Sequence, residues 1–252
     1  MSALLEATAL TKRFGGLLAT DQCSLVLTAG ETHALIGPNG AGKTTLIAQL
    51  AGMLKPDSGA IRFAGADITG RAMHQRVALG IVRSFQITSI FPRFSVLENL
   101  ALGVLGRSGS AWRFWRPLSR EAALYVEAAQ VAVEVGLDER LSAIAGELAH
   151  AEQRQLEVGL ALAARPRLLL LDEPLAGMGP DESQRMIALI ESLKSRIAIL
   201  LVEHDMDAVF RLAERVSVMV SGRVIASGTP HEIRDDAEVR RAYLGETAGE
   251  SA

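Results

Sequence analysis

The segment from Gly37 to Thr44, Gly-Pro-Asn-Gly-Ala-Gly-Lys-Thr, restricts the fold of this chain more than any other. It matches the pattern G-x-x-x-x-G-K-[ST], in which glycines let backbone N–H groups point at phosphate oxygens and the following helix adds its dipole. An apolar run at 32–36 precedes the pattern, and helix-like sequence at 44–51 follows it. An ordinary glycine-rich turn is the alternative, but a strand before and a helix after favour a phosphate-binding loop.

The side chains of this phosphate loop predict ATP with Mg²⁺ as its ligand. Lys43 would neutralise the β and γ phosphates, and Thr44 would place its hydroxyl on the Mg²⁺ that accompanies a nucleoside triphosphate. The residues of this segment that we expect to contact the nucleotide are Gly37, Pro38, Asn39, Gly40, Ala41, Gly42, Lys43, Thr44 and Thr45.

Two adjacent carboxylates, Asp172 and Glu173, follow the apolar run Leu168 to Leu171. They are therefore expected at the C-terminal end of a buried strand, the edge at which open α/β sheets bind their ligands. Asp172 is predicted to support Mg²⁺, and Glu173 to polarise an attacking water. A strand-end turn led by Pro174 is the alternative, which the nearby phosphate loop disfavours.

Two further polar residues follow strand-like runs and are predicted to reach the same edge of the sheet. His204 comes after the apolar run at 197–202 and is placed to contact the γ-phosphate; a cap for the next helix is its alternative. Gln86 ends the strand-like run at 81–85 and is a candidate ligand of Mg²⁺ or of the attacking water, with a surface glutamine as the default.

The order of apolar runs predicts an α/β fold with a central parallel sheet. The runs at 168–171 and 197–202 are continuous rather than alternating, as in strands covered on both faces, and residues 180–194 between them have helical spacing. The runs at 216–220 and 223–226 flank Ser221-Gly222, a hairpin signal. Residues 95–164 instead carry helical signals, which begin at the capping box of Ser95 and Glu98.

Composition excludes several classes of protein. With 26 Lys and Arg against 29 Asp and Glu, the chain has no basic field to hold nucleic acid. The single cysteine, Cys23, forms no internal disulfide and is interpreted as a small buried hydrophobe. The start of the chain is not typical of a secretory signal, and no run approaches the roughly 20 apolar residues that span a bilayer.

The chain resembles the ATP-binding subunits of ABC transporters over nearly its full length, on the order and spacing of Lys43, Gln86, Asp172, Glu173 and His204. It is most similar to the branched-chain amino-acid uptake type, on Lys12-Arg13-Phe14-Gly15-Gly16, Arg83-Ser84-Phe85-Gln86 and Val96-Leu97-Glu98-Asn99-Leu100. The resemblance implies a P-loop NTPase core with a mainly parallel sheet, an antiparallel β subdomain and an inserted helical lobe. It also implies an aromatic ring stacked on adenine, which points to Phe14, with a core phenylalanine as the alternative.

The resemblance implies a dimer in which each ATP lies between one phosphate loop and the partner's signature segment, commonly Leu-Ser-Gly-Gly-Gln. Here the signature segment, residues 148–154, reads Leu-Ala-His-Ala-Glu-Gln-Arg, so Ala149 replaces the serine and Ala151 a glycine. Losing the serine would weaken its contact with the γ-phosphate about tenfold to a hundredfold. The loop at 176–180 also has glycine where the family usually has aspartate. We therefore expect a heterodimer, in which a second ATPase subunit supplies an intact signature to this chain's phosphate loop.

Two aromatic segments are candidate contact surfaces. One combines cations with rings, which suits a membrane interface or a partner groove, although a helix corner with its rings packed inward is equally consistent: Arg107, Trp112, Arg113, Phe114, Trp115, Arg116 and Arg120. The other lies in the region that receives a coupling helix of the membrane subunit in this family, with core packing as the alternative: Ile87, Ile90, Phe91 and Phe94.

These observations predict an ATPase subunit that energises solute import by binding membrane permease subunits at the cytoplasmic face of the inner membrane, without spanning it. The solutes implied by the resemblance are branched-chain amino acids or related small molecules. An exporter subunit of the lipopolysaccharide-transport type, a soluble ABC ATPase and a subunit that binds ATP without hydrolysis are the alternatives. The expected division is a core at 1–94 with its β subdomain, a helical lobe at 95–160, the rest of the core at 161–244 and a flexible tail at 245–252.

Overall fold

Two sheets organise the computed structural model, which describes residues 3–84, 90–107 and 122–241. The larger sheet has six strands in the order β10-β9-β3-β8-β7-β6 and is parallel except for the pair β9 and β10. Its strands are β3 (Thr32–Ile36), β6 (Ile81–Arg83), β7 (Leu168–Asp172), β8 (Ala198–Val202), β9 (Arg215–Val220) and β10 (Arg223–Gly228). The smaller sheet is antiparallel, with the order β2-β1-β4-β5, and consists of β1 (Ala3–Phe14), β2 (Leu17–Thr28), β4 (Ser58–Phe63) and β5 (Ala66–Asp67).

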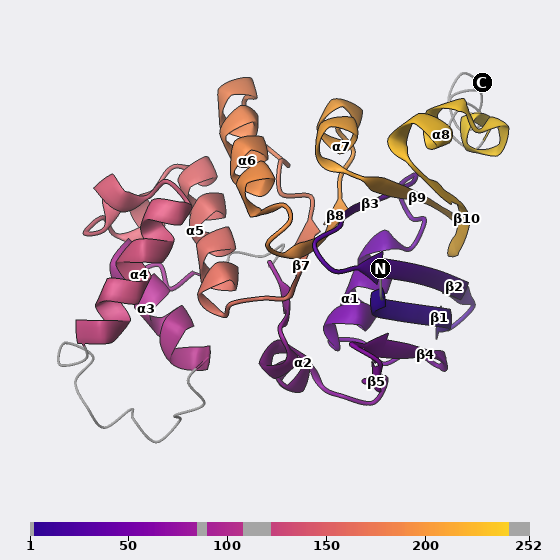
Figure 1. Cartoon of the computed structure of the whole chain (residues 1–252), viewed down its shortest axis with the longest axis horizontal. Helices are drawn as coiled ribbons and strands as arrows, with labels where there is room; N and C mark the ends of the chain where they lie inside the picture. The colour runs from indigo at the N-terminus through magenta and orange to yellow at the C-terminus, as the bar shows by residue number, and fades with distance from the viewer. Residues whose placement is uncertain (1–2, 85–89, 108–121, 242–252) are drawn as a thin grey trace.

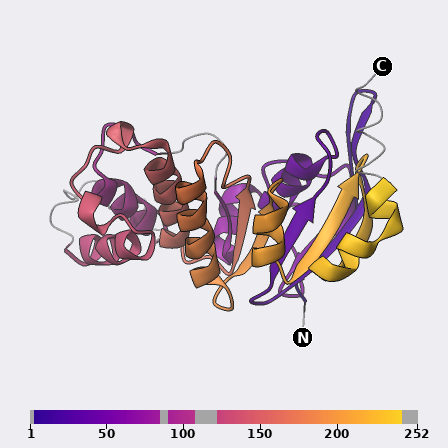
Figure 2. The ribbon, with the colours of Figure 1, turned by 90° about the horizontal axis from the view of Figure 1, so that it is seen from above.

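The helices lie on both sides of the larger sheet. They are α1 (Lys43–Ala51), α2 (Met73–Leu79), α3 (Val96–Arg107), α4 (Ala122–Glu134), α5 (His150–Ala163), α6 (Pro180–Leu193), α7 (Met206–Leu212) and α8 (Pro230–Asp235), with 3-10 turns η3 (Asp138–Arg140) and η4 (Ala145–Glu147). Figures 1 and 2 show α3, α4 and α5 gathered at one end of the molecule and the smaller sheet near the other. The predicted α/β class with a mainly parallel sheet, an antiparallel sheet and a group of helices is therefore confirmed.

Strand β7 explains why the leucine run at 168–171 shows no alternation. Leu169 and Leu171 pack in the apolar cluster formed with α3, α4, α5 and α6, whereas Leu168 and Leu170 pack in the cluster formed with α1 and the smaller sheet. Side chains alternate between the two faces of a strand, so a sheet with a core on each face requires apolar residues at every position. The prediction of a doubly covered strand is confirmed.

The capping box, the hairpin and the buried cysteine predicted from the sequence are also present in the structure. Glu98 N–H donates to Ser95 Oγ at 3.2 Å and Ser95 N–H donates to Glu98 Oε2 at 2.7 Å, which is the predicted capping box before α3. Ser221 and Gly222 have φ values of 47° and 84°, so the turn between β9 and β10 has the left-handed backbone that such hairpins require. Cys23 is buried, and burial raises the pKa of its thiol to about 12.

Helix α1, which begins in the phosphate loop, is held at its far end by Arg76. This buried guanidinium donates to Gln49 O at 2.7 Å and to Leu50 O at 2.8 Å through Nη1. Carbonyls in the last turn of a helix lack intrahelical partners, and a cation there also favours the helix dipole. Burial lowers the pKa of Arg76 to about 10, which still leaves it charged at neutral pH. Arg76 thus anchors the helix that carries Lys43.

Candidate active site

The phosphate loop lies at the C-terminal end of β3 and contains two positions that accept only glycine. A Cβ at Gly37 would lie 2.0 Å from Met219 O, and one at Gly42 would lie 2.0 Å from Ala19 O, both far inside van der Waals contact. Gly42 also has φ of 101°, in the region that side chains rarely adopt. The glycines therefore let the loop pass closely between β2 and β9, which fixes its path.

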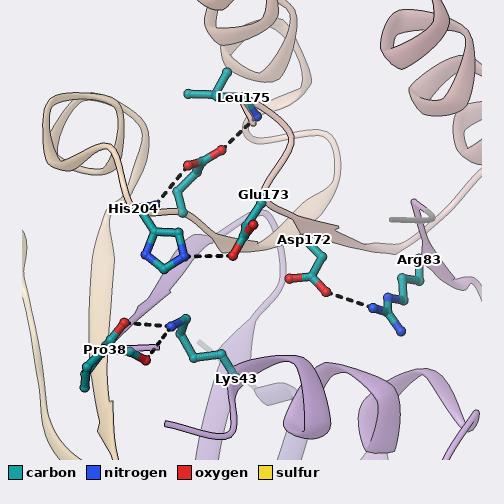
Figure 3. A network of polar contacts seen from close by, with 9 residues as sticks. Pro38, Lys43, Arg83, Asp172, Glu173, Leu175 and His204 are labelled. Carbon is teal, nitrogen blue, oxygen red and sulfur yellow. Dashed lines mark hydrogen bonds and ion pairs between the residues drawn. The ribbon is translucent and has the colours of Figure 1, made fainter. Parts of the chain in front are cut away.

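Lys43 lies across this loop, as Figure 3 shows. Its Nζ donates to Gly37 O at 2.6 Å and to Pro38 O at 2.9 Å, and the residue is buried. Thr44 is exposed and Thr45 half-buried in the first turn of α1. The loop therefore holds a positive charge and an exposed threonine beside the N-terminus of a helix, an arrangement suited to phosphate.

Asp172 ends β7 in a buried position. Its Oδ2 accepts from Arg83 Nη2 at 2.8 Å, whereas Oδ1 is buried without a hydrogen-bond partner among the residues that the structure describes. Burial raises the pKa of Asp172, and the Arg83 guanidinium opposes that shift. A buried carboxylate oxygen without a partner fits a hydrated Mg²⁺, which binds through few protein carboxylates and keeps several waters. Asp172 and Thr44 therefore fit the predicted Mg²⁺.

Glu173 and His204 form a polar pair from the ends of β7 and β8. His204 Nε2 lies 2.7 Å from Glu173 Oε1, and both side chains are partly exposed. Glu173 has φ of 52°, which costs a residue with a side chain on the order of 1–3 kcal/mol. This left-handed turn directs the chain away from the strand. Figure 3 shows Lys43, Asp172, Glu173 and His204 gathered around one region of the sheet edge.

Strands β3, β8 and β7 are neighbours in the sheet, which is why their ends bring these residues together. The ligand-binding edge of an open parallel sheet is the one formed by the carboxyl ends of its strands. The sequence located Lys43, Asp172, Glu173 and His204 at this edge, and the structure places them there. It does not describe Gln86, which lies in the segment 85–89 outside the described residues.

The sequence analysis did not predict the roles of two charged residues of the site. Arg83 pairs with Asp172, and Glu203, only 5% exposed, accepts from Leu175 N–H at 2.8 Å and from His204 N–H at 2.9 Å. The sequence did contain a signal for both residues, because each is a charged residue that ends or directly follows a short apolar strand.

The predicted adenine-stacking residue, Phe14, is 48% exposed at the end of β1, with Lys12 Nζ at 5.8 Å from its ring centroid.

The signature segment leads into α5, and the side chain at its serine position has no donor. Ala149 is exposed and precedes α5 as its N-cap, but without a capping side chain; its N–H donates to Glu152 Oε2 at 3.0 Å. Gly179 is the N-cap of α6 and likewise donates only its N–H, to Glu182 Oε2 at 2.9 Å. Both segments therefore present backbone and small side chains where hydroxyl or carboxyl groups would lie.

The candidate contact surfaces are only partly described. Ile90 is buried, whereas Phe91 and Phe94 are 50% and 43% exposed and stack on each other with centroids 5.7 Å apart. Core packing therefore accounts for Ile90 and not for the two rings. Ile87 and the tryptophans of the basic segment lie outside the described residues. Among residues 3–84, 90–107 and 122–241, no helix is long and apolar enough to cross a membrane.

Comparisons with known proteins agree with this geometry. A family model described as ABC transporter matches residues 20–176, and one described as branched-chain amino acid ATP-binding cassette transporter matches residues 223–249. The high-affinity branched-chain amino acid transport ATP-binding protein BraF of Pseudomonas aeruginosa is 40% identical in an alignment that covers 96% of this chain and 98% of BraF. LivG of Salmonella typhimurium, described in the same words, is 38% identical over 96% of this chain and 98% of its own length.

Solved structures show the same fold. An ATP-binding cassette of an ABC transporter in its ADP conformation superposes with a TM-score of 0.87 at 30% identity, over 97% of this chain and 100% of that chain. A nucleotide-free ATP-binding cassette of an ABC transporter superposes with a TM-score of 0.86 at 30% identity, over 96% of this chain and 99% of that chain. The chain belongs to the ABC transporter ATP-binding family and is a nucleotide-binding ATPase.

Proposed function

We propose, from its membership of the ABC transporter ATP-binding family, that this chain energises the import of branched-chain amino acids or related small solutes. The relatives at 40% and 38% identity are named as transport ATP-binding proteins for these solutes, and the match at 223–249 supports the same type. Membrane permease subunits are then its partners. The chain binds them from the water side, at the cytoplasmic face of the inner membrane.

The observation that carries the proposed mechanism is the Glu173–His204 pair, 2.7 Å apart, at the strand ends beside the phosphate loop. Glu173 accepts a proton from the attacking water, and His204 orients Glu173 and donates toward the γ-phosphate. Lys43 neutralises charge on the β and γ phosphates, and Phe14 stacks on adenine. Thr44, Asp172 and Gln86 would hold Mg²⁺, which when bound would add charge neutralisation on the phosphates.

In this proposal the helical lobe and the nucleotide-binding core have different functions. The division at 1–94, 95–160 and 161–244 separates the nucleotide-binding core from a lobe that carries the signature segment to the second subunit. Phe91 and Phe94, exposed beside α3, are a suitable contact for a permease helix.

The substitution Glu173→Gln tests the hydrolytic role. It removes the base and keeps the size of the side chain, so ATP turnover in the complex that copurifies with this chain should fall about 10²–10⁴-fold. ATP affinity should stay within about threefold, since Lys43 and the loop are unchanged. Turnover at the wild-type rate would mean that Glu173 is not the base.

The proposed solute is tested by uptake. Cells that lack this gene should accumulate labelled leucine more slowly than the wild type, and the wild-type gene should restore uptake while the Glu173→Gln gene should not. Undiminished uptake of leucine, isoleucine and valine in the deletion strain would refute the assignment of branched-chain amino acids without affecting the ATPase assignment.

A further inference from the structure

We propose that Glu203 is a positioning residue that holds Glu173 and His204 at hydrogen-bonding distance from each other. The inference rests on the proposed function, because it concerns the residues to which that function assigns hydrolysis. Glu203 touches neither of their side chains in this role; it acts through the backbone that carries them.

The carboxylate of Glu203 connects two segments that come from different strands. It lies at the end of β8 with 5% exposure; Oε1 accepts from Leu175 N–H at 2.8 Å and Oε2 accepts from His204 N–H at 2.9 Å. One oxygen therefore binds the turn after Glu173, and the other binds the turn that begins at His204.

The sheet itself stops just short of these two residues. The ladder between β7 and β8 pairs Asp172 with Val202, and Glu173 N–H makes one further bond to Val202 O at 2.9 Å. Beyond it, the left-handed backbone of Glu173, with φ of 52°, turns the chain away from β8. Glu203 continues the connection across this divergence with side-chain oxygens. Without it, the spacing between Glu173 and His204 would depend on two unconnected turns.

The buried negative charge of Glu203 is balanced by the backbone donors that it accepts. Burial raises the pKa of Glu203, the N–H groups of Leu175, His204 and Asp205 lower it, and the nearby Glu173 raises it. A carboxylate has an acceptor oxygen for each turn. A glutamine has one acceptor oxygen and an NH₂ group, so in the same place it would point a donor at one of the two turns and release it.

The substitution Glu203→Gln in the full chain tests the proposal through amide hydrogen exchange and ATP hydrolysis. Amide exchange at Leu175 or His204 should become about tenfold faster or more, because one connection is lost. In the complex that copurifies with the chain, kcat should fall about tenfold to a hundredfold for the same reason. KM for ATP should stay within about a factor of two, since the phosphate loop does not contact Glu203.

Glu31→Gln is the matched control. Glu31 is also a buried acceptor, 8% exposed, and binds Thr28 N–H at 2.8 Å and His33 Nδ1 at 2.9 Å, but it precedes β3 at the opposite edge of the sheet. The Glu31→Gln substitution should leave kcat and the exchange rates of the Leu175 and His204 amides unchanged. An unchanged kcat in Glu203→Gln, or an equal fall in Glu31→Gln, would overturn the proposal.

The wild-type chain supplies a measurement that does not depend on the variant's folding. The amides of Leu175 and His204 should exchange at least about tenfold more slowly than in an unstructured peptide. Unprotected amides at both positions would overturn the inference. Failure of the proposed function would look different. In that case the Glu173→Gln variant would hydrolyse ATP at the wild-type rate, whether or not the amides of Leu175 and His204 are protected from exchange.

Discussion

The residues that surround the phosphate loop and those at positions 149 and 179, in the signature segment and the loop at 176–180, are built differently. Around the loop, charged side chains make short contacts, which are buried for Lys43 with Gly37 O and for Arg83 with Asp172 and partly exposed for Glu173 with His204. In the signature segment and the loop at 176–180, Ala149 and Gly179 cap helices through the backbone alone. The chain therefore has charged side chains around its phosphate loop but no side-chain donor at positions 149 and 179.

We infer from this difference that the two ATP sites of the assembly are unequal. The site that uses this chain's Lys43 receives its signature from another subunit, and the site that uses this chain's Ala149 has lost a donor to the γ-phosphate. A heterodimer accommodates this inequality, because the second subunit can supply a complete signature. A homodimer would contain two weakened sites.

The largest expected effect is on stability, from Arg83→Met. Its partner Asp172 has a fully buried side chain, and removing one member of a buried ion pair typically costs about 3–5 kcal/mol. Without Arg83, the pKa of Asp172 should rise further, since burial remains. A group whose folded pKa is raised loses stability as pH rises through that pKa, so the defect should be larger at neutral pH than at acidic pH. Urea denaturation at both pH values measures it.

Arg140→Met is the control, because Arg140 pairs with a residue of the signature segment. Arg140 pairs with Glu152 of α5 at 2.9 Å, but its side chain is 58% exposed. Exposed pairs contribute about 0–1 kcal/mol, so this variant should lose little stability at either pH. Equal losses of stability in the two variants, or a loss in Arg83→Met that does not depend on pH, would contradict the difference between a buried ion pair at the phosphate site and an exposed one at the signature segment.

A smaller effect is expected on activity, from Ala149→Ser. The serine restores a donor for the γ-phosphate, so the ATPase rate of the purified chain on its own should rise about tenfold. It also provides an N-cap for α5, worth about 0.5–2 kcal/mol. Steady-state phosphate release, measured across chain concentrations because dimerisation is required, tests the first effect. No gain in rate despite a gain in stability would show that Ala149 does not limit the second site.

The smallest effect is expected from Gly179→Ser. Gly179 caps α6, and serine improves on glycine at an N-cap by only a few tenths of a kcal/mol. This variant should raise stability slightly in thermal unfolding and leave the ATPase rate of the chain alone unchanged. An increase in rate comparable to that of Ala149→Ser would mean that helix capping, rather than phosphate contact, explains both results.

The sequence predicted the binding edge better than the contacts that hold it together. Glycine spacing identified the loop at 37–44, and leucines at every position of 168–171 indicated a strand covered on both faces, because backbone sterics and burial act locally. Arg83 and Glu203 were missed, since their partners Asp172 and Leu175 lie 89 and 28 residues away. Only the folded sheet brings those groups together.

The ATPase rate of the purified chain, compared with that of the complex that copurifies with it, tests the central claim most directly. The account predicts that the chain alone hydrolyses ATP at less than about a tenth of the rate of the complex, because the signature that its phosphate loop needs lies in another subunit. A homodimer of this chain that hydrolyses ATP as fast as the complex would contradict the account.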